Sequence, residues 1–184
     1  ETPDVPSIGW GASQHRSCTW TKMRDKKSGK EFFYLNTHLD HRSWPAREES
    51  VKLILARVEE LTGGSDIPVF ITADWNAVST HEIFTPMQDV MLDAREVAPI
   101  TDRRATYNAW KRGDENNENR IIDHIFFRNA EAEKFEVLMD KDVHLTKSKG
   151  GDDKFKWQGF KSVSLDEVRN SGFEENTAVC LIEP

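Results

Sequence analysis

The chain has 184 residues, with 32 acidic and 25 basic side chains and a formal net charge of −7. This length predicts one domain, and the 37% hydrophobic content, with 10 Phe and 6 Trp, is enough for a core and argues against wholesale disorder. No apolar run approaches the roughly 18 residues of a membrane span. The acidic balance argues against long duplex nucleic acid, because proteins that neutralise many phosphates are usually basic.

The two cysteines leave the compartment open. Cys18 and Cys180 lie far apart without metal-site spacing, so they permit one disulfide but do not imply a disulfide framework. The chain begins at Glu1 rather than Met, from which we expect a processed or truncated chain. No basic segment followed by an apolar run, as in a signal peptide, opens the sequence.

A β-hairpin is predicted after an N-terminal loop. Residues 1–15 contain several Pro and Gly and predict the loop. Residues 16–23 and 31–36 are rich in strand formers and flank the turn-like segment 25–30, which contains a Gly. Two such runs around a turn are typical of a hairpin.

A helix and a buried strand follow. Pro45 suits the first turn of a helix that Gly63-Gly64 ends. Apolar residues recur between them at helical spacing, at Val51, Ile54, Leu55, Val58 and Leu61. The continuous apolar run 69–73 is typical of a strand buried on both faces. Strand, helix and strand in this order predict a βαβ-like unit.

The second half predicts shorter strands between polar loops. Segments 111–120 and 146–159 are polar and predict loops. The strands are predicted at 105–110, 121–127, 135–139 and 177–182.

Strong polar residues stand where buried strands end. His38 follows the strand at 31–36, Asp74 and Asn76 follow the strand at 69–73, and Asp123 lies inside the apolar run 121–127. In open α/β folds, groups at the carboxyl ends of strands converge on one crevice. Together these residues could bind a divalent metal, orient a water molecule and contact a phosphate.

Each of these residues also has a structural interpretation. A lone His38 is more often a hydrogen-bonded structural histidine, and Asp74 and Asn76 are ordinary turn residues. Asp123 is costly in an apolar strand unless it is paired, for which Arg120 or a neighbouring turn is available. His41 and His124 are interpreted as neighbours of the site rather than as participants. Spacing alone leaves catalysis at even odds.

Three segments together resemble the endonuclease/exonuclease/phosphatase superfamily. They are Asn36-Thr-His-Leu-Asp40, Thr72-Ala-Asp-Trp-Asn-Ala77 and Ile121-Ile-Asp-His-Ile-Phe126, in the order and rough spacing of that family's motifs. The segments 1–7 and 16–20 are similar to its bacterial branch, and Thr106-Tyr-Asn108 is similar to an element before the third motif. We predict one domain of this family, at residues 1–184. The resemblance covers about residues 1–130, and the tail at 131–184 does not fit the family pattern.

The resemblance implies a mixed α/β fold of two packed sheets with outer helices, a four-layer α/β/β/α sandwich that is incomplete here. It implies in-line hydrolysis of a phosphate ester with Mg or Mn. His38 would contact the scissile phosphate, Asp74 would position or deprotonate the attacking water, and Asn76 would bind a phosphoryl oxygen. Asp123 would orient a general-base histidine. Asp74 and Asn76 are the implied metal ligands, and Asp40 and Asn36 the implied substrate contacts.

The sequence also departs from the family pattern. Nothing in it supplies the family's early metal-binding Glu, and the closing Ser-Asp-His motif does not occur in 128–184. Thr72-Ala-Asp stands where a Gly usually precedes the Asp. His144 is a weak candidate for the missing base. The sequence therefore shows half of an active site.

A metal-dependent phosphoesterase is the leading functional interpretation, with a small or lipid-like phosphate ester favoured over long duplex DNA. The alternatives are a catalytically silent domain that binds phosphate esters or partners, and a fragment with no function of its own. An incomplete sandwich would leave a sheet face or edge uncovered, which predicts self-association or pairing with another chain.

Overall fold

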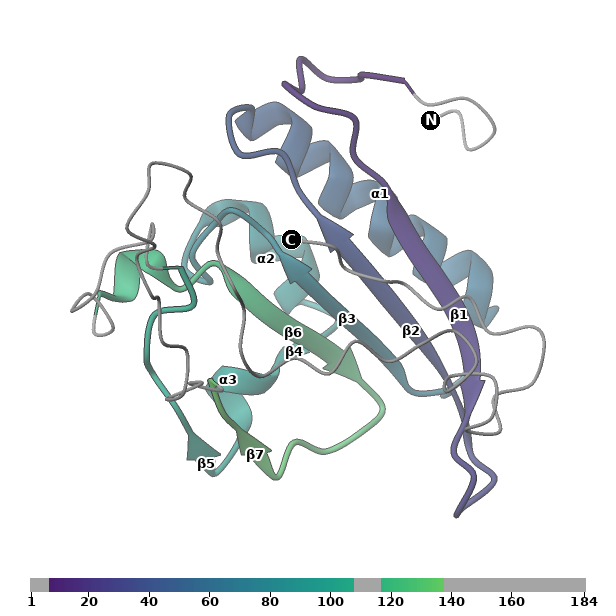
Figure 1. Ribbon diagram of the computed structural model, residues 1–184. Helices are drawn as coiled ribbons and strands as arrows, with labels where there is room; N and C mark the ends of the chain where they lie inside the picture. Colours follow the sequence, from purple (N-terminus) through teal and green to yellow (C-terminus); the bar gives the residue numbers. More distant parts are fainter. Residues whose placement is uncertain (1–6, 108–116, 138–184) are drawn as a thin grey trace, which may run out of the picture. The chain divides into compact units, whose positions relative to one another are not determined.

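A mixed α/β unit is built around one five-stranded sheet (Figure 1). The computed structural model describes residues 7–107 and 117–137, all within one compact unit, Glu1–Val137. The strand order is β1-β2-β3-β6-β4, formed by Cys18–Arg24, Glu31–His38, Val69–Asp74, Asp123–Arg128 and Leu92–Asp93. A separate two-stranded sheet pairs β5, Ile100–Thr101, with β7, Lys134–Phe135. The mixed α/β class with two sheets is confirmed.

The predicted hairpin is confirmed as β1 and β2, which pair antiparallel from Cys18↔Thr37 to Arg24↔Glu31. The turn between them is stabilised by Asp25, whose carboxylate accepts hydrogen bonds from the backbone N–H groups of Lys27 and Ser28. Gly29 follows with φ 71°. This left-handed conformation has little energetic cost for glycine, because glycine has no Cβ.

The predicted helix is confirmed as α1, Trp44–Thr62. Ser43 caps its N-terminus by accepting a hydrogen bond from the Ala46 N–H, and Gly63 ends it with φ 57°. α1 connects β2 to β3, which pair in parallel, so the predicted βαβ unit is also confirmed. Two shorter α-helices follow, α2 at Thr85–Gln88 and α3 at Ala94–Val97, and 3-10 turns lie at Glu82–Phe84 and Glu118–Arg120.

The two faces of the five-stranded sheet carry separate apolar clusters. On the first face, alternate residues of β2 and β3 pack with Val51, Ile54 and Val58 of α1. On the second face, Phe127 of β6 packs with Phe135 of β7, with Phe70 of β3 beside them. Phe70 also stacks on Phe127, with 6.3 Å between ring centroids. The described residues thus form a helical layer, the main sheet and part of a further layer, as expected for an incomplete sandwich.

Two predicted strands are wrong in part. Residues 105–107 are not in a strand, because the N–H groups of Thr106 and Tyr107 both bond to the carbonyl of Arg120. The Thr106 hydroxyl also accepts from the N–H of Asp123. The strand predicted at 135–139 is present as Lys134–Phe135 alone within the described residues, since the N–H of Val137 turns to the Asp102 carboxylate.

The predicted strand at 121–127 begins two residues later, at Asp123, and ends at Arg128. The loop at 146–159, the strand at 177–182 and His144 lie outside the described residues. Where the structure describes a helix, none has the length and hydrophobicity that crossing a membrane requires.

Candidate active site

His38 and Asp74 meet at the carboxyl end of the parallel pair β2 and β3. They are the last residues of their strands and are partners in register. His38 Nε2 lies 3.3 Å from Asp74 Oδ2, and the His38 side chain is 57% exposed against 30% for Asp74. The sheet therefore presents an accessible imidazole held beside a half-buried carboxylate.

Asp123 lies at the same edge of the sheet, at the start of the neighbouring antiparallel strand. β6 runs antiparallel to β3, and its first residue, Asp123, is the register partner of Asp74. Burial raises the pKa of the Asp123 carboxyl, the Thr106 hydroxyl lowers it, and the negative charge of Asp74 raises it again. The net shift is upward. The side chain thus lies at the same sheet edge as Asp74, and it has a hydrogen-bond partner in the Thr106 hydroxyl.

Asn76 stands on the turn that follows β3. Its backbone N–H donates to Asp74 Oδ1 at 2.9 Å, and its side-chain Nδ2 donates to the carbonyl of Leu39 at 2.9 Å. Its φ is 50°, a left-handed conformation that Asn tolerates better than most residues. These bonds join the ends of β2 and β3, so the turn fixes both Asp74 and its own amide beside the site.

Asn36 lies on the same face of β2 as His38, one strand period earlier. Its Nδ2 donates to the Thr72 hydroxyl at 2.8 Å and to the Thr72 carbonyl at 3.1 Å. The Tyr34 hydroxyl is 2.9 Å from the same Thr72 hydroxyl. A row of polar side chains therefore leads along the second face of the sheet toward His38 and Asp74.

Asp40 is placed differently from the implied substrate contact. Its residue is 1% exposed and lies in the loop after β2. Burial alone would raise its pKa, but hydrogen bonds stabilise the carboxylate and hold the pKa well below its ordinary value. The donors are the backbone N–H groups of Ser13, Gln14, Arg42 and Ser43 and the Ser13 hydroxyl. Asp40 is a buried anchor of this loop.

The two neighbouring histidines differ in environment. His41 is exposed, with Nδ1 3.2 Å from a guanidinium nitrogen of Arg16. His124 is buried on the first face of the sheet, with Nδ1 3.0 Å from Asp93 Oδ2 and Nε2 3.1 Å from the carbonyl of Ala77. Neither ring lies on the edge formed by His38 and Asp74. Asp93 was not predicted, because a lone Asp in a two-residue strand carries no signal in the sequence.

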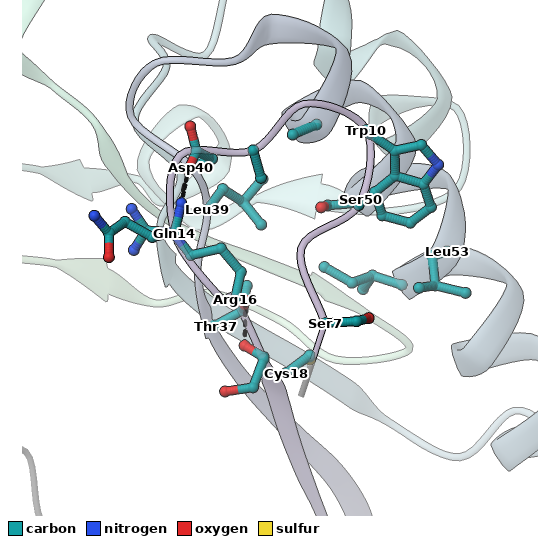
Figure 2. A pocket seen from close by; sticks show the side chains of 15 residues that line it. Ser7, Trp10, Gln14, Arg16, Cys18, Thr37, Leu39, Asp40, Ser50 and Leu53 are labelled. Atoms are coloured by element: carbon teal, nitrogen blue, oxygen red, sulfur yellow. Dashed lines mark hydrogen bonds and ion pairs between the residues drawn. The ribbon is translucent and has the colours of Figure 1, made fainter. Parts of the chain in front are cut away.

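A cavity of about 120 Å³ lies between the N-terminal segment, β1–β2 and α1 (Figure 2). Trp10 and Leu53 line it on the helix side, and Arg16 and Cys18 line it toward the strands. Leu39 also lines it, and its side chain belongs to the core on the first face of the sheet. The cavity is therefore separate from the polar edge that carries His38 and Asp74.

Comparison with known proteins gives a family. The sequence model of the endonuclease/exonuclease/phosphatase family matches residues 3–148. The chain belongs to this family.

Solved structures support the assignment. A mannosyl-6-phosphatase of Bacteroides thetaiotaomicron is 34% identical, with a TM-score of 0.64 over 70% of this chain and 48% of that one. An endonuclease/exonuclease/phosphatase family protein of the same species is 31% identical, with a TM-score of 0.64 over 76% of this chain and 52% of that one. The chain thus spans about half the length of these two proteins.

One curated relative also matches. Nocturnin of Drosophila melanogaster is 25% identical over 145 residues, which cover 64% of this chain and 22% of Nocturnin. This chain spans only part of each of these relatives.

Members of this family generally use a divalent metal. Asp74 and Asn76 offer carboxylate and amide oxygens, the ligands that Mg²⁺ and Mn²⁺ prefer, and Asp123 stands across from Asp74. Over 7–107 and 117–137, however, no three His, Cys, Asp or Glu side chains are arranged to hold an ion.

Proposed function

We propose that this chain acts as a metal-dependent phosphoesterase, which hydrolyses a phosphodiester or phosphomonoester by attack of water. The observation that carries the proposal is the pairing of His38 with Asp74 at 3.3 Å on a sheet edge that also holds Asp123. An exposed imidazole, a carboxylate and a second carboxyl of raised pKa suit phosphate binding and proton transfer.

Each side chain has a role that its environment supports. The exposed His38 imidazole donates to a phosphoryl oxygen and stabilises the charge that develops there. Asp74 Oδ2, within 3.3 Å of His38, accepts a proton from the attacking water. Asn76 Nδ2 carries two hydrogens, one directed to Leu39, so the other can bind a phosphoryl oxygen. Asn36 lies one strand period away, where it would contact a substrate group beyond the phosphate.

Mg²⁺ or Mn²⁺ is part of the proposal, with Asp74 and Asn76 as two of its ligands. Such an ion would supply charge neutralisation at the phosphate. The remaining ligands would come from outside the described residues or from water, because Mg²⁺ usually keeps several waters. The metal requirement is therefore tested directly.

The proposed substrate is a small or lipid-like phosphate ester. The net charge of −7 disfavours a long polyanion, whereas a compact ester needs few positive contacts. Because one similar structure is named as a mannosyl-6-phosphatase, a sugar 6-phosphate belongs among the test substrates.

The test is hydrolysis of bis(p-nitrophenyl) phosphate, p-nitrophenyl phosphate and mannose 6-phosphate by the 184-residue chain. Each is assayed with Mn²⁺, with Mg²⁺ and with EDTA. The variants His38→Ala and Asp74→Ala are compared with His15→Ala, which removes an exposed histidine of the loop before β1. We expect turnover that EDTA, His38→Ala and Asp74→Ala each abolish and that His15→Ala leaves unchanged.

Three other outcomes overturn the proposal. Wild-type rates in His38→Ala or Asp74→Ala would show that any hydrolysis arises elsewhere. No turnover under any condition, with calorimetric binding of the same esters, would identify a silent phosphate-ester-binding domain instead. Neither turnover nor binding would leave a fragment without function of its own.

A further inference from the structure

A buried histidine supports the turn that carries two of the proposed catalytic side chains. His124 is on β6 directly after Asp123, but successive side chains of a strand point to opposite faces. Asp123 faces the site, and His124 faces the core, where its side chain is fully buried. Phe84 and Phe126 pack around the ring, with centroids at 5.6 and 6.1 Å. The imidazole therefore has no access to a substrate.

Both nitrogens of this ring face oxygen atoms. Nδ1 is 3.0 Å from Asp93 Oδ2, and Nε2 is 3.1 Å from the carbonyl oxygen of Ala77. A carbonyl oxygen can only accept, so Nε2–H donates to Ala77. Asp93 is itself fixed, because its Oδ1 accepts from the backbone N–H of Arg95 at 3.0 Å. The result is a rigid connection from the start of α3, through Asp93 and the ring, to Ala77.

Ala77 follows Asn76 directly, so this connection ends at the turn of the site. The same turn is also bonded to β6 and to the residue directly before it. The Trp75 N–H donates to the Ile122 carbonyl at 2.8 Å, and the Trp75 indole Nε1–H donates to the His124 carbonyl at 3.1 Å. Asn76 needs such support, because its φ of 50° is less favourable than an extended or helical conformation.

We propose that His124, held by Asp93, is a positioning residue that fixes the Asp74–Asn76 turn through its bond to the Ala77 carbonyl. This inference rests on the proposed function for its effect on catalysis, but the bond itself is independent of any activity. The pair buries two titratable side chains, which is costly in a core unless both are fully bonded. Here every ring nitrogen and both Asp93 oxygens have partners. A displacement of about 1 Å at a catalytic group can cost about 10²-fold in rate.

Two conservative substitutions separate the two ring bonds. In His124→Gln the amide nitrogen reaches the position of Nε2 and keeps the bond to Ala77. In His124→Asn the shorter amide reaches the position of Nδ1 and keeps the contact with Asp93 alone. Both remove the ring and its packing, so they form a matched pair. His15→Asn, in the exposed loop before β1, is the control for a change of histidine as such.

Kinetics give the first test. We expect His124→Asn to lower kcat by about 10²-fold while KM changes less than about 3-fold, and His124→Gln to keep kcat within about 10-fold of wild type. His15→Asn should match wild type. Equal kcat in the Asn and Gln variants, or a loss carried by KM, would overturn the positioning role.

Hydrogen exchange gives a test that does not depend on activity. The N–H of Asn76 donates to Asp74, so it reports the integrity of the turn. We expect its exchange to be at least about 10-fold faster in His124→Asn and within about 3-fold of wild type in His124→Gln. If wild type shows no hydrolysis, this pattern still supports the positioning bond, and the proposed function alone fails.

The wild-type chain supplies a third measurement in case His124→Asn does not fold. A ring proton that donates to a buried carbonyl is shielded from solvent. We therefore expect the Nε2–H of His124 to give its own imidazole ¹H–¹⁵N signal that persists under solvent saturation. A ring whose Nε2 proton exchanges as fast as that of His15 would contradict the proposal.

Discussion

The Nε2 atom of His38 lies 3.3 Å from Oδ2 of Asp74, and the two residues are register partners at the ends of parallel strands. The α1 helix makes this contact possible, because it returns the chain so that β2 and β3 run in the same direction. Two side chains that are far apart in sequence thus share one edge. Because they are in contact, we expect them to act as a unit.

A double-mutant cycle tests this unit. His38→Gln and Asp74→Asn are each expected to lower kcat/KM by about 10³-fold. The kcat/KM of the double variant should be no more than about 10-fold below that of the less active single variant. The reason is that either change breaks the same His38–Asp74 contact, which holds both the phosphate-binding imidazole and the water-activating carboxylate in place. Steady-state kinetics on the most reactive ester decide it. Multiplicative losses near 10⁶-fold would mean that the two side chains act independently.

The raised pKa of Asp123 predicts opposite effects on stability and activity. Because the pKa is higher in the folded than in the unfolded chain, the favourable contribution of the protonated carboxyl is complete below about pH 4. It is lost as the pH rises through the folded value. At pH 7, Asp123→Asn is therefore expected to raise Tm by about 1–3 °C in EDTA and to lower kcat in the assay with Mn²⁺ or Mg²⁺. The Tm of the variant minus that of wild type should therefore be larger at pH 7 than at pH 4. A smaller difference at pH 7 would contradict the prediction.

The elements with strong local signals were predicted from the sequence. The helix at Trp44–Thr62 has a cap, a helical period and a terminating Gly, and the strand at Val69–Asp74 is a continuous apolar run. Residues 105–107 show the limit of such reasoning. They contain strand-forming residue types, but a strand also needs a partner, and their N–H groups bond to Arg120 instead.

The ends of the predicted strands indicate that the residues of the candidate site lie close together, but they do not give the direction of every strand that carries them. Strands that end in parallel predict that His38 and Asp74 meet, whereas Asp123 reaches the same edge from an antiparallel strand, which no local pattern reveals. The resemblance to the family implies that Asp40 contacts substrate, but β2 ends at His38, and the following loop buries both Leu39 and Asp40. The substrate contact of Asp40 stays a prediction.

Two substitutions of Asp40 separate a structural from a substrate-binding role. Asp40→Ala leaves several half-buried N–H groups without their acceptor, and we expect it to reduce the free energy of unfolding by about 2–4 kcal/mol. Asp40→Asn keeps one acceptor oxygen and should cost less. Urea titration gives the stability, and KM gives the substrate role. If the Asp40→Asn variant folds but its KM is raised tenfold, Asp40 contacts the substrate directly.

Acid unfolding should also depend on Asp40. Since its pKa is lowered in the folded chain, its contribution to stability is present above the unfolded value of about 3.9 and is lost as the pH falls below it. The Asp40→Asn variant is therefore expected to lose less stability than wild type between pH 5 and the acid transition. Parallel losses in both proteins, followed by circular dichroism, would refute this.

Asn76 allows its backbone and side-chain contributions to be separated. Asn76→Ala and Asn76→Gly both remove the bond from Nδ2 to Leu39, but only Ala is strained at φ 50°. We expect Gly to retain about 1 kcal/mol more of the free energy of unfolding than Ala. Both should reduce kcat if the amide binds the phosphoryl oxygen. Equal stability of the two variants would indicate that the turn relaxes out of its left-handed conformation.

The thiol of Cys18, which lines the cavity beside α1, is free and is expected to react slowly. Burial raises its pKa to about 11, so about 0.1% is thiolate at pH 8, compared with about a quarter for an ordinary cysteine. In a Cys180→Ser variant, the reaction with Ellman's reagent should therefore be about 10²-fold slower in buffer than in urea. The test also bears on a bridge between the two cysteines. The wild-type chain is titrated in urea without reductant, and its reactive thiols are counted. Two thiols per chain would exclude the bridge, whereas no reactive thiol would show that Cys18 is oxidised in the purified chain.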